Sequence, residues 1–310
     1  MNRKLIWLIG CAVLAAGTVL LYSSGPDERK MESTPRNAPL SPPSPSTETE
    51  APIKTTPVGE TKVSDAVQKI VDDSGDALTR VKLVNRLSRN LSEADRLALY
   101  NYLRHGASSR ETNPLKNDIL NVLRDQTVPP PELTQVMLDI FYDENQSMAI
   151  RSYALQHMRP WYWEENMRDP AIRQAFYDGL EQTGNELSGV ALLALAYLSE
   201  ELPADFDRND IAQKAAALAD TPSVSELTRV SALDISSRYG NASALEAARN
   251  ILKTETDNVM LRAAACGVIG RMGDVSDLEI LQQVGRNNSP LRVAVNSAEV
   301  KINRRSGSKK

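Results

Sequence analysis

Residues 257–273 read DNVMLRAAACGVIGRMG, and the order of residue types in this stretch recurs along most of the chain. An aspartate stands five positions before Arg262, and small apolar residues follow at helical spacing until glycines close the stretch. Small residues allow neighbouring helices to approach to the short end of the usual packing distance. The stretch therefore predicts one helix of a helical repeat.

The positions equivalent to Arg262 form a regular series, which we call the ladder positions. They are Arg80, Lys116, Arg151, Ala191, Arg229, Arg262 and Arg292. The steps between them are 36, 35, 40, 38, 33 and 30 residues. Periods of this length are typical of stacked helix pairs.

Companion helices are predicted between the ladder helices, because apolar residues recur there at three- and four-residue spacing. Ser223 and Ser243, each with a glutamate three positions later, are expected to cap helix starts. Gly106, Gly240 and Gly273 are expected to end helices in the left-handed conformation. No stretch alternates as a strand does, so the predicted fold class is all-α. The expected companion ranges are 93–104, 130–142, 170–181, 208–219, 243–252 and 276–285.

Three aspartates lie in turns that precede ladder arginines. They are Asp143, Asp220 and Asp257, which precede Arg151, Arg229 and Arg262. A carboxylate placed there accepts hydrogen bonds from free helix N–H groups and pairs with a guanidinium. We therefore expect these side chains to link adjacent repeats, which is a structural role.

The pattern Asp–x–x–x–(Val/Leu)–Arg–x–x–Ala, followed by Gly270, Gly273 and Asp274, resembles HEAT repeats. The nearest subtype is the HEAT-like repeat first described in phycobilisome lyases. The resemblance covers residues 77–304 and is strongest from Asp220 onward. It implies an α-solenoid of about six to seven HEAT-like hairpins over residues 61–304. Such arrays serve mainly as scaffolds and adaptors, so the resemblance is specific for fold and unspecific for activity.

The N-terminus predicts a membrane anchor. Arg3 and Lys4 precede a charge-free apolar run from Leu5 to Tyr22, which as a helix is about 27 Å long and nearly spans the hydrocarbon core. We predict a transmembrane anchor at 1–22, with membrane contact through residues 5–22. A cleaved signal peptide followed by secretion and a lipoprotein acylated at Cys11 stay open as alternatives. The two basic residues predict that the rest of the chain lies outside the cytoplasm, in a bacterial periplasm.

Two further segments differ from the repeats in composition. Residues 23–60 are rich in Pro, Ser and Thr without apolar periodicity, which predicts a disordered linker. Residues 305–310 are predicted to form a basic tail. The chain as a whole carries a formal charge of −4, which argues against a nucleic-acid partner because phosphate neutralisation needs a basic surface.

The sequence offers little to support catalysis. Two cysteines and two histidines supply neither a disulfide framework nor a histidine-rich metal site. Cys266 and His157 stand in ladder helices, where packing explains the cysteine and either packing or a surface position explains the histidine. We expect no catalytic residue, no metal and no cofactor, and we expect the protein not to be an enzyme.

One segment is a candidate for binding a protein partner. Tryptophan, tyrosine and arginine are the residue types that most often contribute strongly to protein interfaces. They gather where we predict the longest loop, and the candidates are Trp161, Tyr162, Trp163, Arg159 and Arg168. The alternative is that the aromatic residues fold back to fill a stacking defect beside the repeat that lacks its arginine.

The expected function is that of a membrane-tethered scaffold or adaptor for another envelope protein. A lyase-like or chaperone-like accessory factor that binds a cofactor or client protein is the alternative implied by the resemblance. A structural element of the wall-spanning envelope is a third hypothesis.

Overall fold

The computed structural model describes residues 62–254, 257–287 and 289–307. These residues form helices, turns and loops, with no strand among them, so the all-α prediction is confirmed. None of the helices in this part of the chain is both long and apolar enough to cross a bilayer. The predicted anchor at 1–22 and the predicted linker at 23–60 lie outside the described residues.

The helices follow one another with short connections. They are α2 (Asp65–Val71), α3 (Ala77–Val84), α4 (Glu93–His105), α5 (Asn113–Arg124), α6 (Glu132–Tyr142), α7 (Met148–Trp163), α8 (Pro170–Leu180), α9 (Leu187–Glu201), α10 (Arg208–Asp220), α11 (Glu226–Arg238), α12 (Ala242–Thr254), α13 (Val259–Met272), α14 (Leu278–Asn287) and α15 (Arg292–Gly307). Three short 3-10 turns accompany them: η1 (Glu165–Met167), η2 (Val275–Asp277) and η3 (Ser289–Leu291).

Apolar spacing accounts for these helices. In α5, for example, Leu115, Ile119, Leu120 and Leu123 recur on one face and are fully buried. The six companion helices begin and end within two residues of their predicted bounds. The helix α15 continues through Gly307, so the predicted basic tail begins inside a helix.

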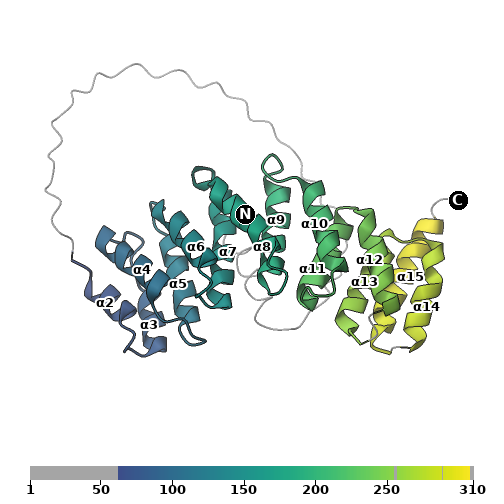
Figure 1. Ribbon diagram of the computed structural model, residues 1–310, viewed down its shortest axis with the longest axis horizontal. Helices are drawn as coiled ribbons and strands as arrows, with labels where there is room; N and C mark the ends of the chain where they lie inside the picture. Colours follow the sequence, from purple (N-terminus) through teal and green to yellow (C-terminus); the bar gives the residue numbers. More distant parts are fainter. Residues whose placement is uncertain (1–61, 255–256, 288, 308–310) are drawn as a thin grey trace, which may run out of the picture. The chain divides into compact units, whose positions relative to one another are not determined.

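The helices pack in two rows (Figure 1). Each even-numbered helix pairs with the odd-numbered helix that follows it, from α2 with α3 to α14 with α15. Every odd-numbered helix also packs on the next one, from α3 to α15. The even-numbered helices do the same, except that α8 and α10 lack a contact comparable to the others described. The buried apolar residues of both rows form one core.

Aromatic and cationic side chains occupy the space between α8 and α10. Phe206, in the loop before α10, is fully buried, and the ring of Tyr162 meets it edge-on at 5.4 Å between centroids. The guanidinium of Arg173 lies 5.6 Å from the same ring centroid. The ammonium of Lys214 lies 5.8 Å from the ring of Tyr177, which joins α10 to α8. These contacts replace the direct helix packing found elsewhere in the row.

Several predicted helix caps were wrong in detail. The start of α11 is capped by Ser225 rather than Ser223. Asn241 accepts the backbone N–H of Ser243 at the start of α12. The prediction at Gly240 is confirmed, because its φ of 75° is left-handed, whereas Gly273 has a φ of −69° and the prediction there was wrong. At Gly106, φ is −65°, and glycine is needed there for space, because a Cβ atom would lie 2.4 Å from the ring of Tyr102.

Candidate binding surface

The ladder cations hold the ends of the preceding helices. The Nε atoms of Arg80, Arg151 and Arg229 donate to the backbone carbonyls ten positions earlier, at 2.7, 2.8 and 3.0 Å. The Nζ atom of Lys116 donates to the carbonyl of Gly106, again ten positions earlier. These carbonyls lie at helix C-termini, where no N–H of the helix reaches them and where the helix dipole favours a cation. Arg262 is buried at the equivalent place in α13.

Two ladder positions differ from this arrangement. Ala191 has no cation, and the carbonyl ten positions earlier, that of Glu181, accepts the backbone N–H of Thr183 instead. Gly179 allows the close approach there, because a Cβ on it would lie 3.0 Å from the Cβ of Ala191. Arg292 is exposed at the start of α15.

The predicted aspartates lie at the turns that precede their ladder helices. Asp143 accepts from the backbone and side-chain N–H groups of Asn145, and these bonds hold the pKa of its carboxyl below the usual value. Asp220 and Asp257 are exposed. An aspartate that the sequence did not single out, Asp73, accepts from the buried Arg80 at 3.1 Å.

The aromatic segment lies in a helix, not in a loop as predicted. Trp161, Tyr162 and Trp163 form the last turn of α7, which continues past Pro160. Trp161 is 2% exposed, and its indole N–H donates to the hydroxyl of Thr134 at 2.8 Å. Tyr162 is also buried, whereas Trp163 is 45% exposed. The three candidates therefore separate into two packing residues and one surface residue.

The predicted arginines lie near this helix end. The guanidinium of Arg159 lies 4.9 Å from the ring centroid of Tyr197 on α9. The indole of Trp163 meets the same tyrosine edge-on, at 6.1 Å between ring centroids. Arg168 forms an ion pair with Asp205 at 3.9 Å. Trp163, Arg159 and Tyr197 thus lie together on the surface of α7 and α9.

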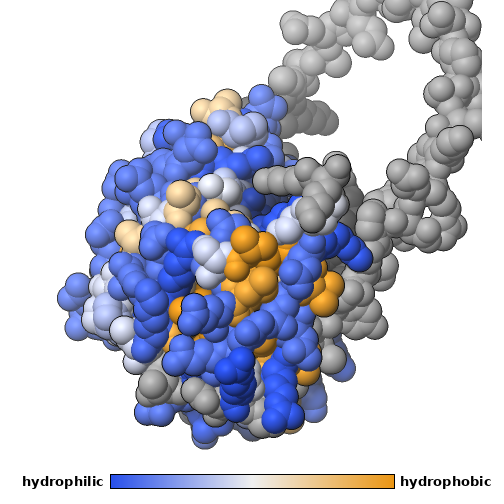
Figure 2. Space-filling model, turned by 90° about the vertical axis from the view of Figure 1, so that its right-hand side faces the viewer, coloured by the Kyte–Doolittle hydropathy of each residue, from blue (hydrophilic) through white to orange (hydrophobic). Residues whose placement is uncertain are grey.

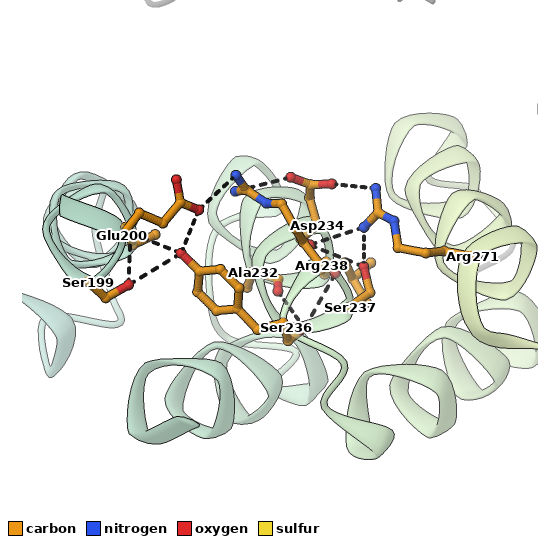
Figure 3. Close-up of polar contacts among 11 residues, drawn as sticks. Ser199, Glu200, Ala232, Asp234, Ser236, Ser237, Arg238 and Arg271 are labelled. Carbon is orange, nitrogen blue, oxygen red and sulfur yellow. Dashed lines mark hydrogen bonds and ion pairs between the residues drawn. The ribbon is translucent and has the colours of Figure 1, made fainter. Parts of the chain in front are cut away.

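A polar network continues this surface across α9, α11 and α13 (Figure 3). Glu200 on α9 accepts from the hydroxyl of Tyr239 at 2.9 Å and from Arg238 at 3.4 Å. Arg238 also pairs with Asp234, one turn earlier in α11, at 3.5 Å. Arg271 on α13 donates to the other carboxylate oxygen of Asp234 at 3.0 Å. The charges alternate in sign along the chain of contacts, to which α11 contributes one residue of each sign.

We call the whole surface the exposed strip. It consists of Arg159, Trp163, Tyr197, Glu200, Asp234, Arg238, Tyr239 and Arg271. The sequence did not predict the part beyond α7. The sequence does contain a signal for that part, which is that charged residues recur nine positions after ladder positions. They are Glu200, Arg238 and Arg271.

The network contributes little to stability. The side chains of Glu200, Arg238, Asp234 and Arg271 are each 40–54% exposed. Ion pairs with this exposure contribute about 0–1 kcal/mol, because water and salt screen them. In the structure they orient these long side chains along the surface.

No protein-family model, no curated protein and no solved structure matches the chain.

The interior titratable groups serve packing. One ring nitrogen of His157 lies 3.1 Å from the guanidinium of Arg124 and the other lies 3.1 Å from the side-chain oxygen of Asn117. Burial lowers the pKa of the imidazole to about 3, and the positive charge of Arg124 also lowers it. Burial raises the pKa of the Cys266 thiol to about 11, so this cysteine is a thiol at neutral pH. Neither group suits general acid–base or nucleophilic work near pH 7.

The described residues offer no candidate metal site. They contain no group of three or more His, Cys, Asp or Glu side chains able to hold a metal ion. A cavity of about 220 Å³ lies beside Arg104, Asp139 and Gln146. Ligand pockets of about 300–1,000 Å³ are the norm, so this one is small for a tetrapyrrole.

The buried Lys116 is expected to make the free energy of unfolding depend on pH. Its ammonium is fully buried between the carbonyl of Gly106, the hydroxyl of Ser108 and the amide oxygen of Gln146. Burial lowers its pKa from 10.5 to about 8. Between these values the unfolded chain binds a proton that the folded chain has lost, so the free energy of unfolding rises with pH.

We expect Lys116→Met to abolish the part of this rise that lies between pH 8 and 10.5. Urea unfolding at a series of pH values measures it. Lys82→Met, on the exposed face of α3, is the matched control and leaves the pH profile unchanged. A variant profile that still rises as steeply as that of the natural chain would contradict the assignment to Lys116.

Proposed function

We propose that residues 61–304 form an α-solenoid of HEAT-like hairpins, and that the chain is a non-enzymatic scaffold or adaptor. Consecutive antiparallel hairpins and a single core across both rows support the solenoid. The recurrent ten-residue hydrogen bond of the ladder cations supports a true structural repeat. Hairpins of this kind stack through nearest neighbours and expose long surfaces that suit protein binding.

The exposed strip is the observation that carries the proposal. It crosses four consecutive helices of one row and combines a half-exposed tryptophan with fixed arginines. Tryptophan, tyrosine and arginine dominate the energetics of protein interfaces, and pre-positioned side chains lower the entropy cost of binding. Alternating charges favour a partner that presents charges of opposite sign at the corresponding positions.

We also propose that the scaffold is tethered to a membrane through residues 5–22, with the helical part in the periplasm. The charge-free apolar run and the two basic residues before it support this proposal. The Pro-rich composition of residues 23–60 supports a spacer between anchor and solenoid. A scaffold placed in this way would gather a second envelope protein near the bilayer.

The test is affinity purification from solubilised membranes, with partners identified by mass spectrometry. Trp163→Ala and Arg271→Ala remove side chains from opposite ends of the exposed strip. We expect each to reduce recovery of a specific partner by about tenfold or more, as loss of an interface anchor does.

Leu97→Ala is the matched control, because Leu97 is an exposed apolar residue on α4 in the other row. All three variants should melt within about 4 °C of the natural chain. If both strip variants recover every partner as well as the control does, the exposed strip is not the binding surface.

A further inference from the structure

The face of α15 that points away from α13 exposes aliphatic side chains. Val293 and Val300 are 73% and 60% exposed, and the small side chain of Ser297 is exposed between them. Figure 2 views this side of the molecule and shows an apolar patch with hydrophilic residues beside it. Positions i, i+4 and i+7 fall on one face of a helix, so these three residues form a continuous stripe with a valine at each end. We call it the α15 stripe.

The α15 stripe is distinct from the face that the helix buries. The buried residues Val295, Ala298 and Ile302 lie nearly opposite the stripe at about 100° per residue. Gly270 of α13 fits against this buried face, because a Cβ on it would lie 2.8 Å from the Cα of Ala298. The helix α15 therefore has one face used by the core and a second face that exposes two valines to solvent.

The helix α3, at the other end of the same row, also exposes an apolar side chain. Leu78 is 62% exposed and lies on the side of α3 opposite the buried Arg80 and Val84. Val81 beside it is half-buried. Both end helices of the row therefore present aliphatic residues outward.

The exposed charges at the two hairpin turns beside these faces are opposite, whereas Lys82 further along α3 and Lys301 further along α15 are both cationic. Arg286 and Arg292 are exposed on either side of the turn between α14 and α15. Asp72 and Asp76 are exposed in the turn between α2 and α3. Both are hairpin turns, so they lie at the same edge of the two rows. Hydrogen bonds from the Ser74 backbone and from Thr79 lower the pKa values of the two aspartates, which keeps both ionised.

We propose that copies of this chain associate head to tail, with α15 of one copy packed against α3 of the next. This contact repeats the packing that joins successive odd-numbered helices within the chain. Leu78 packs between Val293 and Val300, where the small Ser297 leaves room for it, and Arg292 comes near the turn that holds Asp76. The interface is heterologous, because different surfaces of the two copies meet, and it leaves a free end on each side. Each free end can bind a further copy, so assemblies longer than a dimer form through the same contact.

The test uses the full-length chain in detergent, studied by sedimentation velocity over a range of concentrations. The natural chain should form dimers and longer species as its concentration rises. Val300→Glu blocks the α15 face and Leu78→Glu blocks the α3 face, because each buries an unpaired charge in the contact. Each variant alone should associate at least about tenfold more weakly than the natural chain.

Mixing the two variants gives the decisive result. The intact α15 face of the Leu78→Glu chain meets the intact α3 face of the Val300→Glu chain, so the mixture should form dimers and nothing longer. A fluorescent label on one variant allows the mixed dimer to be followed. Val128→Glu, at a 77% exposed position between α5 and α6, is the control and should associate like the natural chain.

Three outcomes would overturn the proposal. A natural chain that stays monomeric shows that no such contact forms. Association of Leu78→Glu alone, with no mixed dimer in the mixture, indicates a symmetric contact between two α15 faces. Association that persists in Val300→Glu alone points to another surface, such as the N-terminal apolar run that all variants share. Circular dichroism melts confirm that both variants fold, since the substituted side chains lie outside the core.

Discussion

Trp161→Ala is expected to lower the free energy of unfolding by about 3–5 kcal/mol, the range typical of removing a buried tryptophan side chain. The indole is buried among α6, α7 and their neighbours, and its N–H bonds to Thr134. Alanine leaves a cavity that the surrounding helices fill only in part, and the hydroxyl of Thr134 loses its donor. Equilibrium unfolding in urea, followed by circular dichroism, measures the loss.

Trp163→Ala is the internal control for this prediction. Trp163 is two positions further along the same helix and half-exposed, so its removal should cost no more than about 1 kcal/mol. A similar loss at both positions would mean that the two tryptophans share one environment. That result would contradict the division between a packing residue and a surface residue on which the exposed strip depends.

Arg151→Met should lower the free energy of unfolding by about 1.5–3 kcal/mol. Its guanidinium is buried and donates to the carbonyl of Phe141 at 2.8 Å, and methionine cannot replace that donor. The side chains have similar length, so the substitution removes the hydrogen bond with little change in packing. Thermal or urea unfolding provides the measurement.

Two further variants show whether the stability loss comes from the buried hydrogen bond. Arg151→Lys should recover part of the loss, because Lys116 makes the same ten-residue bond in the neighbouring hairpin. Arg292→Met changes the equivalent residue where it is exposed, and should leave stability within about 0.5 kcal/mol of the natural chain. Equal losses at Arg151 and Arg292 would assign the effect to charge alone rather than to the buried bond.

The sequence predicted the helices well because burial imposes a regular period on it. The apolar spacing of α5, with Leu115, Ile119 and Leu123 inward, is visible without a structure. The caps were less predictable, because several residues within one turn can accept the same N–H groups. Ser223 and Ser225 both qualify by type, and only the backbone geometry selects Ser225.

The candidate surface could be predicted only in part. The sequence predicted a loop over this segment, although the apolar period of Leu155 and Met158 continues to Trp161. That continuation was the available signal for a buried position. The partnership of Trp163 with Tyr197 depends on how α7 packs beside α9, and no local pattern encodes it. Tertiary packing therefore decides which of the three aromatic residues reaches the surface.

The ten-residue bond of the ladder cations has a consequence for how the chain folds. Each of these bonds closes a short loop within one hairpin, and short loops lose little entropy on closure. A hairpin can therefore form its own turn before its neighbours arrive, and the transition state needs few distant contacts. Nucleation can start at any hairpin that carries the cation and spread in both directions. The hairpin of α8 and α9, which has Ala191 in that place, then joins a nucleus formed elsewhere.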